Sequence, residues 1–309
     1  MARGRAPLRI GVIGLGDIAR KAYLPVLAAQ PGLELHLHTR TPATLHAVGD
    51  AHRLPHRHTT LDDLLAADLD AAFVHAPTGD HVAIGTRLVE AGVPLYVDKP
   101  LAYDADGARA LVDLAERRRV PLMVGFNRRY APGYTQCLDH PRDLVLMQKN
   151  RVGLPEDVRT VVFDDFVHVV DTLRFLAPGP VEQVLVSARV RDGLLHHVVL
   201  HLSGDGFTAI GSMNRMSGST EESLDVSGAD ARRQVLNLAE VVDHRGQPTL
   251  RRRGDWVPVA RQRGIEQITL AFLDAVREGT VLDGRDALRT HELCERIVAE
   301  ITGEPVTRA

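Results

Sequence analysis

The first part of the chain alternates short apolar runs with longer segments of helical periodicity. Helical patterns begin near Ile18, Thr60, Asp80 and Asp104, between the apolar runs. The runs are Arg9–Ile13, Leu33–His38, Ala71–His75, Leu95–Val97 and Pro121–Val124. Strands that alternate with helices predict a Rossmann-type, doubly wound parallel sheet covered by helices, which we assign to residues 1–126.

The pattern changes after Phe126. One helical segment, about Asp164–Leu176, precedes a series of strand-like runs, and two closing helices are expected near Ile265–Glu278 and Asp286–Ile301. The runs are Gln183–Arg191, His197–Leu202, Phe207–Asn214, Ser223–Ser227 and Val235–Asp243. Successive strands without intervening helices predict a mostly antiparallel open sheet. The expected fold class is therefore α/β, with a C-terminal α+β domain over residues 127–309.

Composition narrows the class of protein. Hydrophobic residues make up 44% and charged residues 25% of the 309 positions, which suits a globular chain of about two domains. The formal net charge of -3 gives no global basic field, so we expect a small-molecule partner, no nucleic acid and no membrane. Cys137 and Cys294 are too few for a disulfide framework, and no apolar leader follows the charged start, so a cytoplasmic location is expected.

A glycine-rich segment follows the first expected strand. It reads Gly14-x-Gly16-x-x-Ala19 and leads into a helical pattern. A glycine turn lets the backbone approach a pyrophosphate, and the N-terminus of the following helix presents free N–H groups and a positive dipole to it. Because both neighbouring elements are in place, the motif predicts a dinucleotide site, with an ordinary tight turn as the alternative.

The end of the second expected strand indicates which nucleotide binds. This position normally offers a carboxylate to the adenosine ribose, but the chain reads Thr39-Arg40-Thr41 there. Hydroxyls and a guanidinium suit a 2′-phosphate, which arginine can contact with two hydrogen bonds. The sequence therefore favours NADP(H) over NAD(H). Alternatively, Arg40 stacks on the adenine or faces solvent.

Two later strand ends also carry polar residues. Thr78 follows the third run, where it either meets the ligand or caps the next helix. The fourth run leads into Asp98-Lys99-Pro100, and the proline restricts the backbone on both sides of its peptide bond. This favours a lysine held over the cofactor, although Lys99 taken alone reads as a surface charge.

Asp164, His168 and Asp171 share one face of the expected helix, because they follow i, i+4, i+7. A carboxylate one turn from an imidazole can orient the ring and raise its basicity, as a proton-transfer site requires. The alternative is a satisfied interfacial histidine with a helix-capping aspartate.

The other histidine and arginine clusters indicate no second chemistry. The histidine groups lack cysteine or a carboxylate at ligand spacing, so no metal site is expected. These groups are His36/His38, His52/His56/His58 and His196/His197/His201. The run from Arg251 to Arg253 is interpreted as a solvated strand end or turn.

Together these segments resemble the family of glucose–fructose oxidoreductase, inositol dehydrogenase and MocA. The motifs in the family's order are Gly14-x-Gly16-x-x-Ala19, Pro77-Thr78-x-x-His81, Asp98-Lys99-Pro100 and Asp164-x-x-x-His168. Within the family the chain looks most like MviM-like oxidoreductases, through residues 14–25, 97–101, 124–130 and 164–172. The resemblance spans nearly the whole chain.

The resemblance implies reversible hydride transfer between a nicotinamide and a carbinol carbon of a sugar, cyclitol or related small hydroxy compound. Lys99 would stabilise the developing alkoxide, His168 would act as general acid and base, and Asp164 would orient His168. It implies cofactor contacts from Gly14, Gly16, Asp17, Ile18, Ala19, Thr39, Arg40, Thr41, Ala76, Pro77, Thr78, His81, Asp98, Lys99, Pro100 and Asn127.

Substrate contacts are expected from a second set of residues. These are Arg128, Tyr130, Lys149, Asn150, Arg151, Asp164 and His168. Alternatively, Arg128 is a strut between the domains, and residues 149–151 end a strand in solvent.

Three positions depart from the family's pattern. Asp98 replaces a glutamate, Phe166 stands where glycine is usual, and Thr39 replaces the acid of many NAD-dependent relatives. Phe166 would narrow the pocket beside His168, which puts the substrate class in doubt more than the chemistry. Thr39 agrees with NADP(H).

Two other functions remain open. Some relatives keep the nucleotide and use transient oxidation to cleave glycosides, and the same fold can serve as a non-catalytic nucleotide or sugar sensor. The presence of Lys99, Asp164 and His168 together argues against a sensor. By analogy with relatives, the C-terminal domain is expected to bind substrate and to form a homodimer or homotetramer.

Overall fold

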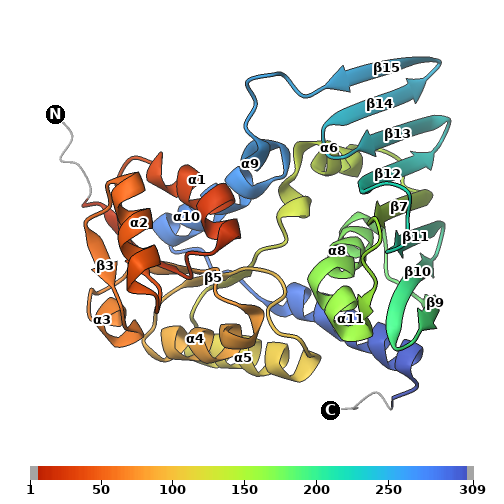
Figure 1. Cartoon of the computed structure of the whole chain (residues 1–309). Coiled ribbons are helices and arrows are strands. Elements are labelled where there is room, and N and C mark those ends of the chain that lie inside the picture. The colour runs from red at the N-terminus through yellow and green to blue at the C-terminus, as the bar shows by residue number, and fades with distance from the viewer. Residues whose placement is uncertain (1–5, 305–309) are drawn as a thin grey trace. The chain divides into compact units, whose positions relative to one another are not determined.

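Figure 1 shows the computed structural model of the chain, which describes residues 6–304. Most of the charged start discussed above lies outside these residues. Among the described helices, none is long and apolar enough to cross a membrane. The chain divides into two compact units: unit 1 runs to Gly125 and includes Ile265–Leu288, and unit 2 holds Phe126–Gly264 and the residues from Arg289 onward.

Unit 1 is built on a six-stranded parallel sheet in the order β3-β2-β1-β4-β5-β6. The strands are β1 (Leu8–Ile13), β2 (Leu33–His38), β3 (His56–His58), β4 (Ala71–Val74), β5 (Leu95–Val97) and β6 (Leu122–Val124). The strand order reverses between β1 and β4, which is the doubly wound arrangement predicted from the sequence. In this arrangement the carboxyl ends of the strands, where ligands bind, share one edge of the sheet.

Helices connect the strands of unit 1. They are a π-helix (Ala19–Tyr23), α1 (Leu24–Ala28), α2 (Pro42–His52), α3 (Leu61–Leu65), α4 (Thr78–Glu90), α5 (Ala105–Arg118) and α10 (Ile265–Glu278). Side-chain caps fix two of the starts: Thr60 accepts from the Asp63 N–H at 3.1 Å, and Asp104 accepts from the Gly107 N–H at 2.6 Å. Neither α2 nor β3 was predicted from the sequence.

Helix α10 belongs to unit 1, although it lies far along the chain. The Phe272 ring lies 5.1 Å from the Phe73 ring, edge to face, and 5.8 Å from the Tyr96 ring. Fully buried aromatic rings in this arrangement contribute strongly to a core. The structure therefore differs from the expected division, which placed every residue after 126 in the second domain.

Unit 2 is built on a nine-stranded sheet in the order β15-β14-β13-β12-β7-β11-β10-β8, with β9 paired to β10. The strands are β7 (Leu144–Asn150), β8 (Glu156–Asp157), β9 (Gln183–Arg191), β10 (Leu194–Gly204), β11 (Phe207–Asn214), β12 (Glu221–Gly228), β13 (Ala231–Leu236), β14 (Glu240–Arg245) and β15 (Gln247–Arg252). Only the β7–β11 pair is parallel. The predicted mostly antiparallel sheet is confirmed.

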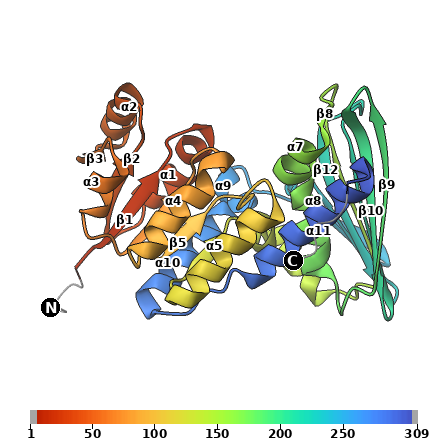
Figure 2. The ribbon, with the colours of Figure 1, turned by 90° about the horizontal axis from the view of Figure 1, so that it is seen from below.

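Several helices and helical turns accompany the sheet of unit 2. They are a 3₁₀ turn (Asn127–Tyr130), α6 (Pro132–Thr135), a 3₁₀ turn (Gln136–Asp139), α7 (Val158–Thr160), a π-helix (Val161–Phe166), α8 (Val167–Leu176), α9 (Val259–Gln262) and α11 (Arg285–Thr302), whose first turn falls in unit 1. In Figure 2, α8 lies along one face of the sheet. Gly211 on β11 makes this approach possible, because a Cβ there would lie 2.3 Å from Val169 Cγ1.

Two details of unit 2 refine the expectations. The prediction of a single strand over Val235–Asp243 is wrong. Asn237 and Leu238 adopt φ of 51° and 58° and reverse the chain, so this segment forms a hairpin between β13 and β14. Arg251 and Arg252 form the exposed end of strand β15, as the first of the two interpretations predicts, and Arg253 follows the strand. Within it, Arg251 pairs with Asp243 at 2.9 Å.

Candidate functional site

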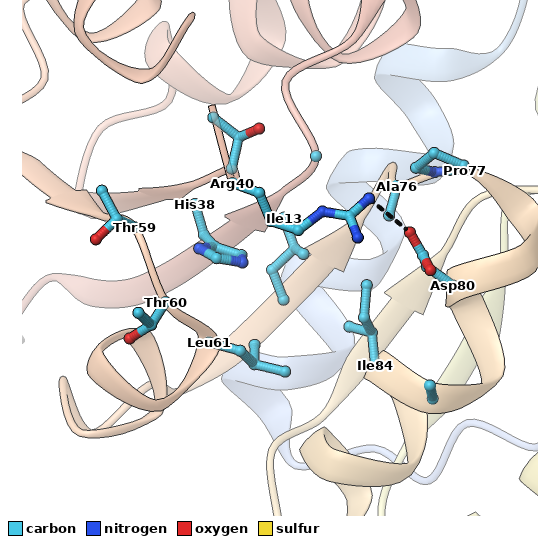
Figure 3. A pocket seen from close by; sticks show the side chains of 13 residues that line it. Ile13, His38, Arg40, Thr59, Thr60, Leu61, Ala76, Pro77, Asp80 and Ile84 are labelled. Atoms are coloured by element: carbon cyan, nitrogen blue, oxygen red, sulfur yellow. Dashed lines mark hydrogen bonds and ion pairs between the residues drawn. The ribbon is translucent and has the colours of Figure 1, made fainter. Parts of the chain in front are cut away.

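A pocket of about 280 Å³ lies at the carboxyl ends of β1, β2 and β4 (Figure 3). Five expected cofactor residues line it: Gly14, Thr39, Arg40, Ala76 and Pro77. The other lining residues were not predicted from the sequence; they are Ile13, His38, Thr59, Thr60, Leu61, Asp80, Ala83 and Ile84. The pocket stands where a doubly wound sheet binds its ligand.

The two motif glycines serve different purposes. Gly14 has φ +87°, and a Cβ there would lie 2.5 Å from the Ala76 nitrogen, so only glycine lets β1 pass this close to the chain after β4. A Cβ at Gly16 would meet no protein atom within 4 Å. The helical turn that follows begins with the Arg20 N–H donating to the Gly16 carbonyl at 3.0 Å. The space at Gly16 and the free N–H groups of this turn fit a pyrophosphate.

Arg40 crosses the mouth of this pocket. Its Nη2 lies 3.1 Å from Asp80 Oδ2 on α4, and Figure 3 shows the guanidinium directed toward that carboxylate. Both side chains are exposed, so the ion pair is weak and a phosphate can compete for Arg40. The pocket thus holds a guanidinium that a 2′-phosphate could use.

Asp98 and Lys99 follow β5, at the same edge of the sheet, and the Lys99–Pro100 peptide bond is cis. Asp98 Oδ1 accepts from the Lys99 backbone N–H at 2.8 Å. Asp98 Oδ2 lies 3.4 Å from Nδ1 of the buried His75. Through these two contacts Asp98 holds the backbone of the half-buried Lys99.

His81 braces two loops rather than lining the pocket. Its ring is 1% exposed and lies between the Pro100 carbonyl, at 2.9 Å from Nδ1, and the Ala76 carbonyl, at 2.8 Å from Nε2. Burial lowers the pKa of His81, and the hydrogen bonds to the two carbonyls oppose this shift.

Two other expected cofactor residues, Asp17 and Thr78, lie in settings that were not predicted. The carboxylate of Asp17 pairs with Arg20 at 2.7 Å and Lys21 at 2.6 Å. The alternative that Thr78 caps the next helix is wrong, because Pro77 is the N-cap residue of α4 and no side chain caps it.

The helix that carries His168 is not a regular α-helix. A π-helix over Val161–Phe166 precedes α8, so its wider turn changes the angle between successive side chains. Asp164 lies in the π-helix and His168 in the first turn of α8, whereas one uniform helix was expected. The one-turn spacing of Asp164 and His168 therefore spans a change of helix type.

His168 is 8% exposed and contacts a buried arginine. Arg128 Nη1 donates to His168 Nδ1 at 2.8 Å. Arg128 also holds Glu222 on β12 with two hydrogen bonds, of 2.8 Å and 2.7 Å, and the Tyr134 hydroxyl donates to Glu222 at 2.9 Å. Because a guanidinium only donates, Nδ1 is the acceptor and a neutral His168 carries its proton on Nε2.

The Arg128–Glu222 pair is tightly held. Burial alone would raise the pKa of Glu222, but the charge and hydrogen bonds of Arg128 lower it to about 2. Burial likewise opposes the charge on Arg128, yet Glu222 raises its pKa above the ordinary value. The alternative that Arg128 is a strut between domains is wrong, since both partners described here lie in unit 2.

Asp165, next to Asp164, gathers three cations. It lies 2.6 Å from Lys149, 2.9 Å from Arg151 and 2.7 Å from Arg215. Lys149 is only 2% exposed, so it does not end β7 in solvent, contrary to the alternative interpretation. Burial, together with repulsion from Arg128, lowers the pKa of Lys149 to about 8. Burial would raise the pKa of Asp165, but Lys149 lowers it below the ordinary value.

Asp171 and the expected cofactor residue Asn127 have structural contacts. Asp171, on the same helix as His168, accepts from Arg129 at 2.6 Å and from the Thr290 hydroxyl at 3.0 Å. The Asn127 amide donates to the Arg263 carbonyl at 2.7 Å. All three contacts join segments within unit 2.

The structure thus brings the expected residues into two groups, one in each unit. Glu222, Asp165 and Arg215 were missed as partners. The sequence gives no sign that Glu222 meets Arg128, 94 positions away, or that Arg215 meets Asp165, 50 positions away. Asp165 meets Lys149 and Arg151 at only 16 and 14 positions, but their pairing was not predicted either. The run Asp164-Asp165 was the one available signal, since it offers two carboxylates where one was considered.

Comparisons with known proteins agree with this geometry. The family model described as an oxidoreductase family with an NAD-binding Rossmann fold matches residues 8–126, and a YceM-like C-terminal domain matches residues 134–245. The YceM protein of Salmonella typhimurium is 35% identical over 312 residues, which cover 96% of this chain and 99% of that protein.

A solved structure and a shorter match extend these comparisons. The dehydrogenase MviM of Clostridium difficile superposes with a TM-score of 0.90 at 28% identity, covering 95% of this chain and 99% of the other. A myo-inositol dehydrogenase of Streptomyces leeuwenhoekii is 36% identical over 138 residues, 45% of this chain and 37% of that protein. The resemblance identified from the sequence motifs is confirmed.

Proposed function

The chain belongs to the Gfo/Idh/MocA family of oxidoreductases, and on that premise we propose that it transfers hydride between NADP(H) and a CH–OH carbon of a sugar or cyclitol. Membership makes the chain an NAD(P)-dependent dehydrogenase or reductase of CH–OH groups. The pocket at the end of β1, together with the open space beside Gly16, is the observation that carries the proposal.

Residues of unit 1 would hold the cofactor. Gly14 and Gly16 would receive the pyrophosphate, and Thr39, Arg40 and Thr41 the 2′-phosphate. When bound, the nicotinamide supplies the hydride donor and acceptor. The preference for NADP(H) is supported by the missing carboxylate after β2 and by Arg40 at the pocket mouth.

Lys99 and His168 would serve the reacting oxygen. The ammonium of Lys99 stabilises negative charge as the oxygen becomes an alkoxide. With Nδ1 accepting from Arg128, the neutral ring offers its Nε2–H as a hydrogen-bond donor to that oxygen. To transfer a proton during reduction, the ring would leave Arg128 and become an imidazolium, and it would be neutral again after donating. In the reverse direction the proton returns to the ring. Asp164 acts as a positioning residue for His168.

Residues of unit 2 support a polyhydroxyl substrate. The cations around Asp165 are already balanced in part, because Arg215 also contacts Glu156 at 3.3 Å. Cationic side chains whose charge is partly neutralised can donate hydrogen bonds to several hydroxyls, and they do not require an anionic substrate. The myo-inositol dehydrogenase named above is one relative with a polyol in its name.

Turnover of the nicotinamide tests this function. The full chain is mixed with NADPH or NADH and ketosugars or inosose, or with the oxidised cofactors and sugars or inositols, while nicotinamide absorbance is followed. We expect net turnover with at least one substrate, faster with NADP(H). Binding of both cofactors without net turnover would instead support the glycoside-cleaving or sensor alternatives, and failure to bind either cofactor would refute the proposal.

Replacing Arg40 by alanine tests the cofactor preference. We expect the NADPH Kd to rise about 10- to 100-fold, because a charge-assisted hydrogen bond contributes about 1.5–3 kcal/mol, while the NADH Kd stays within about threefold. Asp80→Asn is the matched control, since it frees Arg40 and should not weaken NADPH. Equal weakening of both nucleotides by Arg40→Ala would show that Arg40 stacks on the adenine instead.

We also propose that unit 2 forms a homodimer or homotetramer through the sheet face opposite α8. Leu146, Ile210, His201 and Leu185 follow one another across β7, β11, β10 and β9, on the face away from Gly211. Leu146 is 38% and Leu185 61% exposed. Exposed apolar side chains grouped on a sheet are typical of an interface.

Light scattering after size exclusion tests this assembly. We expect the wild type to have the mass of a dimer or tetramer, and Leu146→Lys/Leu185→Lys to be a monomer, because charges opposed across the interface are costly. Trp256→Lys, which removes a 97% exposed apolar residue elsewhere in unit 2, is the control and should leave the mass unchanged. A monomeric wild type would contradict the proposal.

A further inference from the structure

A cluster of metal-ligating side chains lies on the edge of the unit 1 sheet. Glu34 and His36 are two positions apart on β2 and therefore share a face, and His56 on β3 is the register partner of His36. One ligand atom from each of the three residues lies within 4.8 Å of the others. The expectation of no metal site overlooked the carboxylate of Glu34, two residues before His36.

The interatomic distances suit a small ion. His36 Nε2 lies 3.0 Å from Glu34 Oε1, and His56 Nε2 lies 3.8 Å from Glu34 Oε2. Bonds of about 2.0–2.2 Å in a tetrahedral zinc site place neighbouring ligand atoms roughly 3.3–3.6 Å apart, between these two values. The rings of His36 and His56 are stacked with centroids 4.5 Å apart, so His56 has to tilt toward the carboxylate. Its side chain is 42% exposed, which leaves room for this movement.

A second histidine supports His36 from behind. His36 Nδ1 lies 3.0 Å from His58 Nε2, and the His36 ring is buried. Metal-binding histidines commonly donate their other ring N–H to a neighbouring acceptor, which fixes the tautomer and the ring orientation. Without a metal, Nε2–H of His36 donates to Glu34 at 3.0 Å and Nδ1 accepts from His58. A metal bound at Nε2 would displace that proton, and Nδ1–H would then donate to His58.

We propose that Glu34, His36 and His56 bind one divalent first-row transition-metal ion, with Zn²⁺ as the probe. Two imidazoles and one carboxylate suit Zn²⁺ and its neighbours, whereas Mg²⁺ and Ca²⁺ prefer all-oxygen sites. Three protein ligands leave a fourth position for water. The ion would join the edge strand β3 to β2.

The position of this site suggests what the ion would stabilise. Strand β3 leads directly into Thr59 and Thr60, which line the nucleotide pocket together with His38 at the end of β2. His38 Nδ1 also lies 3.0 Å from the His58 carbonyl. A metal that joins β2 to β3 would therefore hold one wall of the pocket, away from Gly14 and Gly16.

Equilibrium dialysis of the full chain, freed of metal with a chelator, tests the proposal. We expect the wild type to take up one equivalent of Zn²⁺, and Mg²⁺ not to compete. Glu34→Gln and His56→Ala should abolish this tight uptake, and His58→Ala should weaken it about 10- to 100-fold, as expected for a residue that orients a ligand. His197→Ala, at an exposed histidine of β10, is the matched control and should bind like the wild type.

Thermal unfolding gives a readout that does not depend on activity. Zn²⁺ should raise the Tm of the wild type and of His197→Ala, but not that of His56→Ala. Circular dichroism of His56→Ala without metal should match the wild type, which would separate loss of a ligand from loss of the fold. Equal Zn²⁺ uptake by the wild type and His56→Ala, or no uptake by the wild type, would overturn the proposal.

Discussion

Alanine in place of His168 is expected to lower kcat by about 10²- to 10⁴-fold, the usual contribution of a positioned proton-transfer group. The NADPH Kd should change little, because the nucleotide pocket lies in unit 1 and His168 in unit 2. Lys99→Met should also lower kcat, by roughly 10²- to 10³-fold, through loss of charge stabilisation at the oxygen. Stopped-flow kinetics and nucleotide titrations measure these effects separately.

Variants of neighbouring residues distinguish proton transfer from a structural role. Asp164→Asn should lower kcat less than His168→Ala and shift the pH profile of kcat, if Asp164 has the proposed role of positioning His168. His197→Ala is the control and should keep wild-type kinetics. A His168→Ala enzyme that folds, binds NADPH and turns over at the wild-type rate would refute the acid–base assignment.

Methionine in place of Arg128 is expected to lower the free energy of unfolding by about 3–5 kcal/mol at pH 7. The substitution leaves Glu222 charged and buried without its partner, which costs more than the pair itself contributes. Arg232→Met is the matched control, since Arg232 pairs with Asp225 at a half-exposed position and should cost less than about 1 kcal/mol. Urea unfolding measures both changes.

The pH dependence of unfolding also tests the role of the Arg128–Glu222 pair. In the wild type the pKa of Glu222 is about 2, below its ordinary value of 4.5, so the stabilisation is present above pH 4.5 and is lost as the pH falls toward 2. Without Arg128, burial raises the pKa of Glu222, and the folded state takes up a proton. The destabilisation by Arg128→Met should therefore be smaller at pH 5 than at pH 8.

A double variant separates the buried charge from lost packing. Arg128→Met/Glu222→Met removes both charges and should be more stable than Arg128→Met alone. A cost below about 1 kcal/mol for Arg128→Met, independent of pH, would show that Glu222 finds another partner or becomes hydrated.

The strands of unit 1 could be predicted closely because buried parallel strands are short continuous apolar runs between turn residues. Leu33–His38 and Leu95–Val97 have the predicted bounds. Strand β3 was missed because His56-Arg57-His58 is polar, and an edge strand needs less apolar surface than a central one. Because β3 was missed, the sequence predicted neither the pocket wall at Thr59 and Thr60 nor the pairing of His56 with His36.

The side-chain contacts in unit 2 could not be predicted from the spacing of residues in the sequence. The local pattern at Asp164 and His168 is visible in the sequence, but the π-helix changes the angle between them and brings Asp165 to Lys149. Glu222 lies on β12 beside β7, and it meets Arg128, which is 94 residues earlier in the chain. Such pairings depend on strand order, which one sequence does not specify.

The position of α10 in unit 1 has a consequence for the order of synthesis. When the ribosome has made residues 1–125, every strand of the parallel sheet is present, but Phe272 is not yet there to cover Phe73 and Tyr96. Leu273, the next residue of α10, is also fully buried in the finished protein. A nascent chain therefore carries an uncovered aromatic surface until residues 265–288 have left the ribosome, and the nucleotide-binding unit matures only after most of unit 2 has been translated.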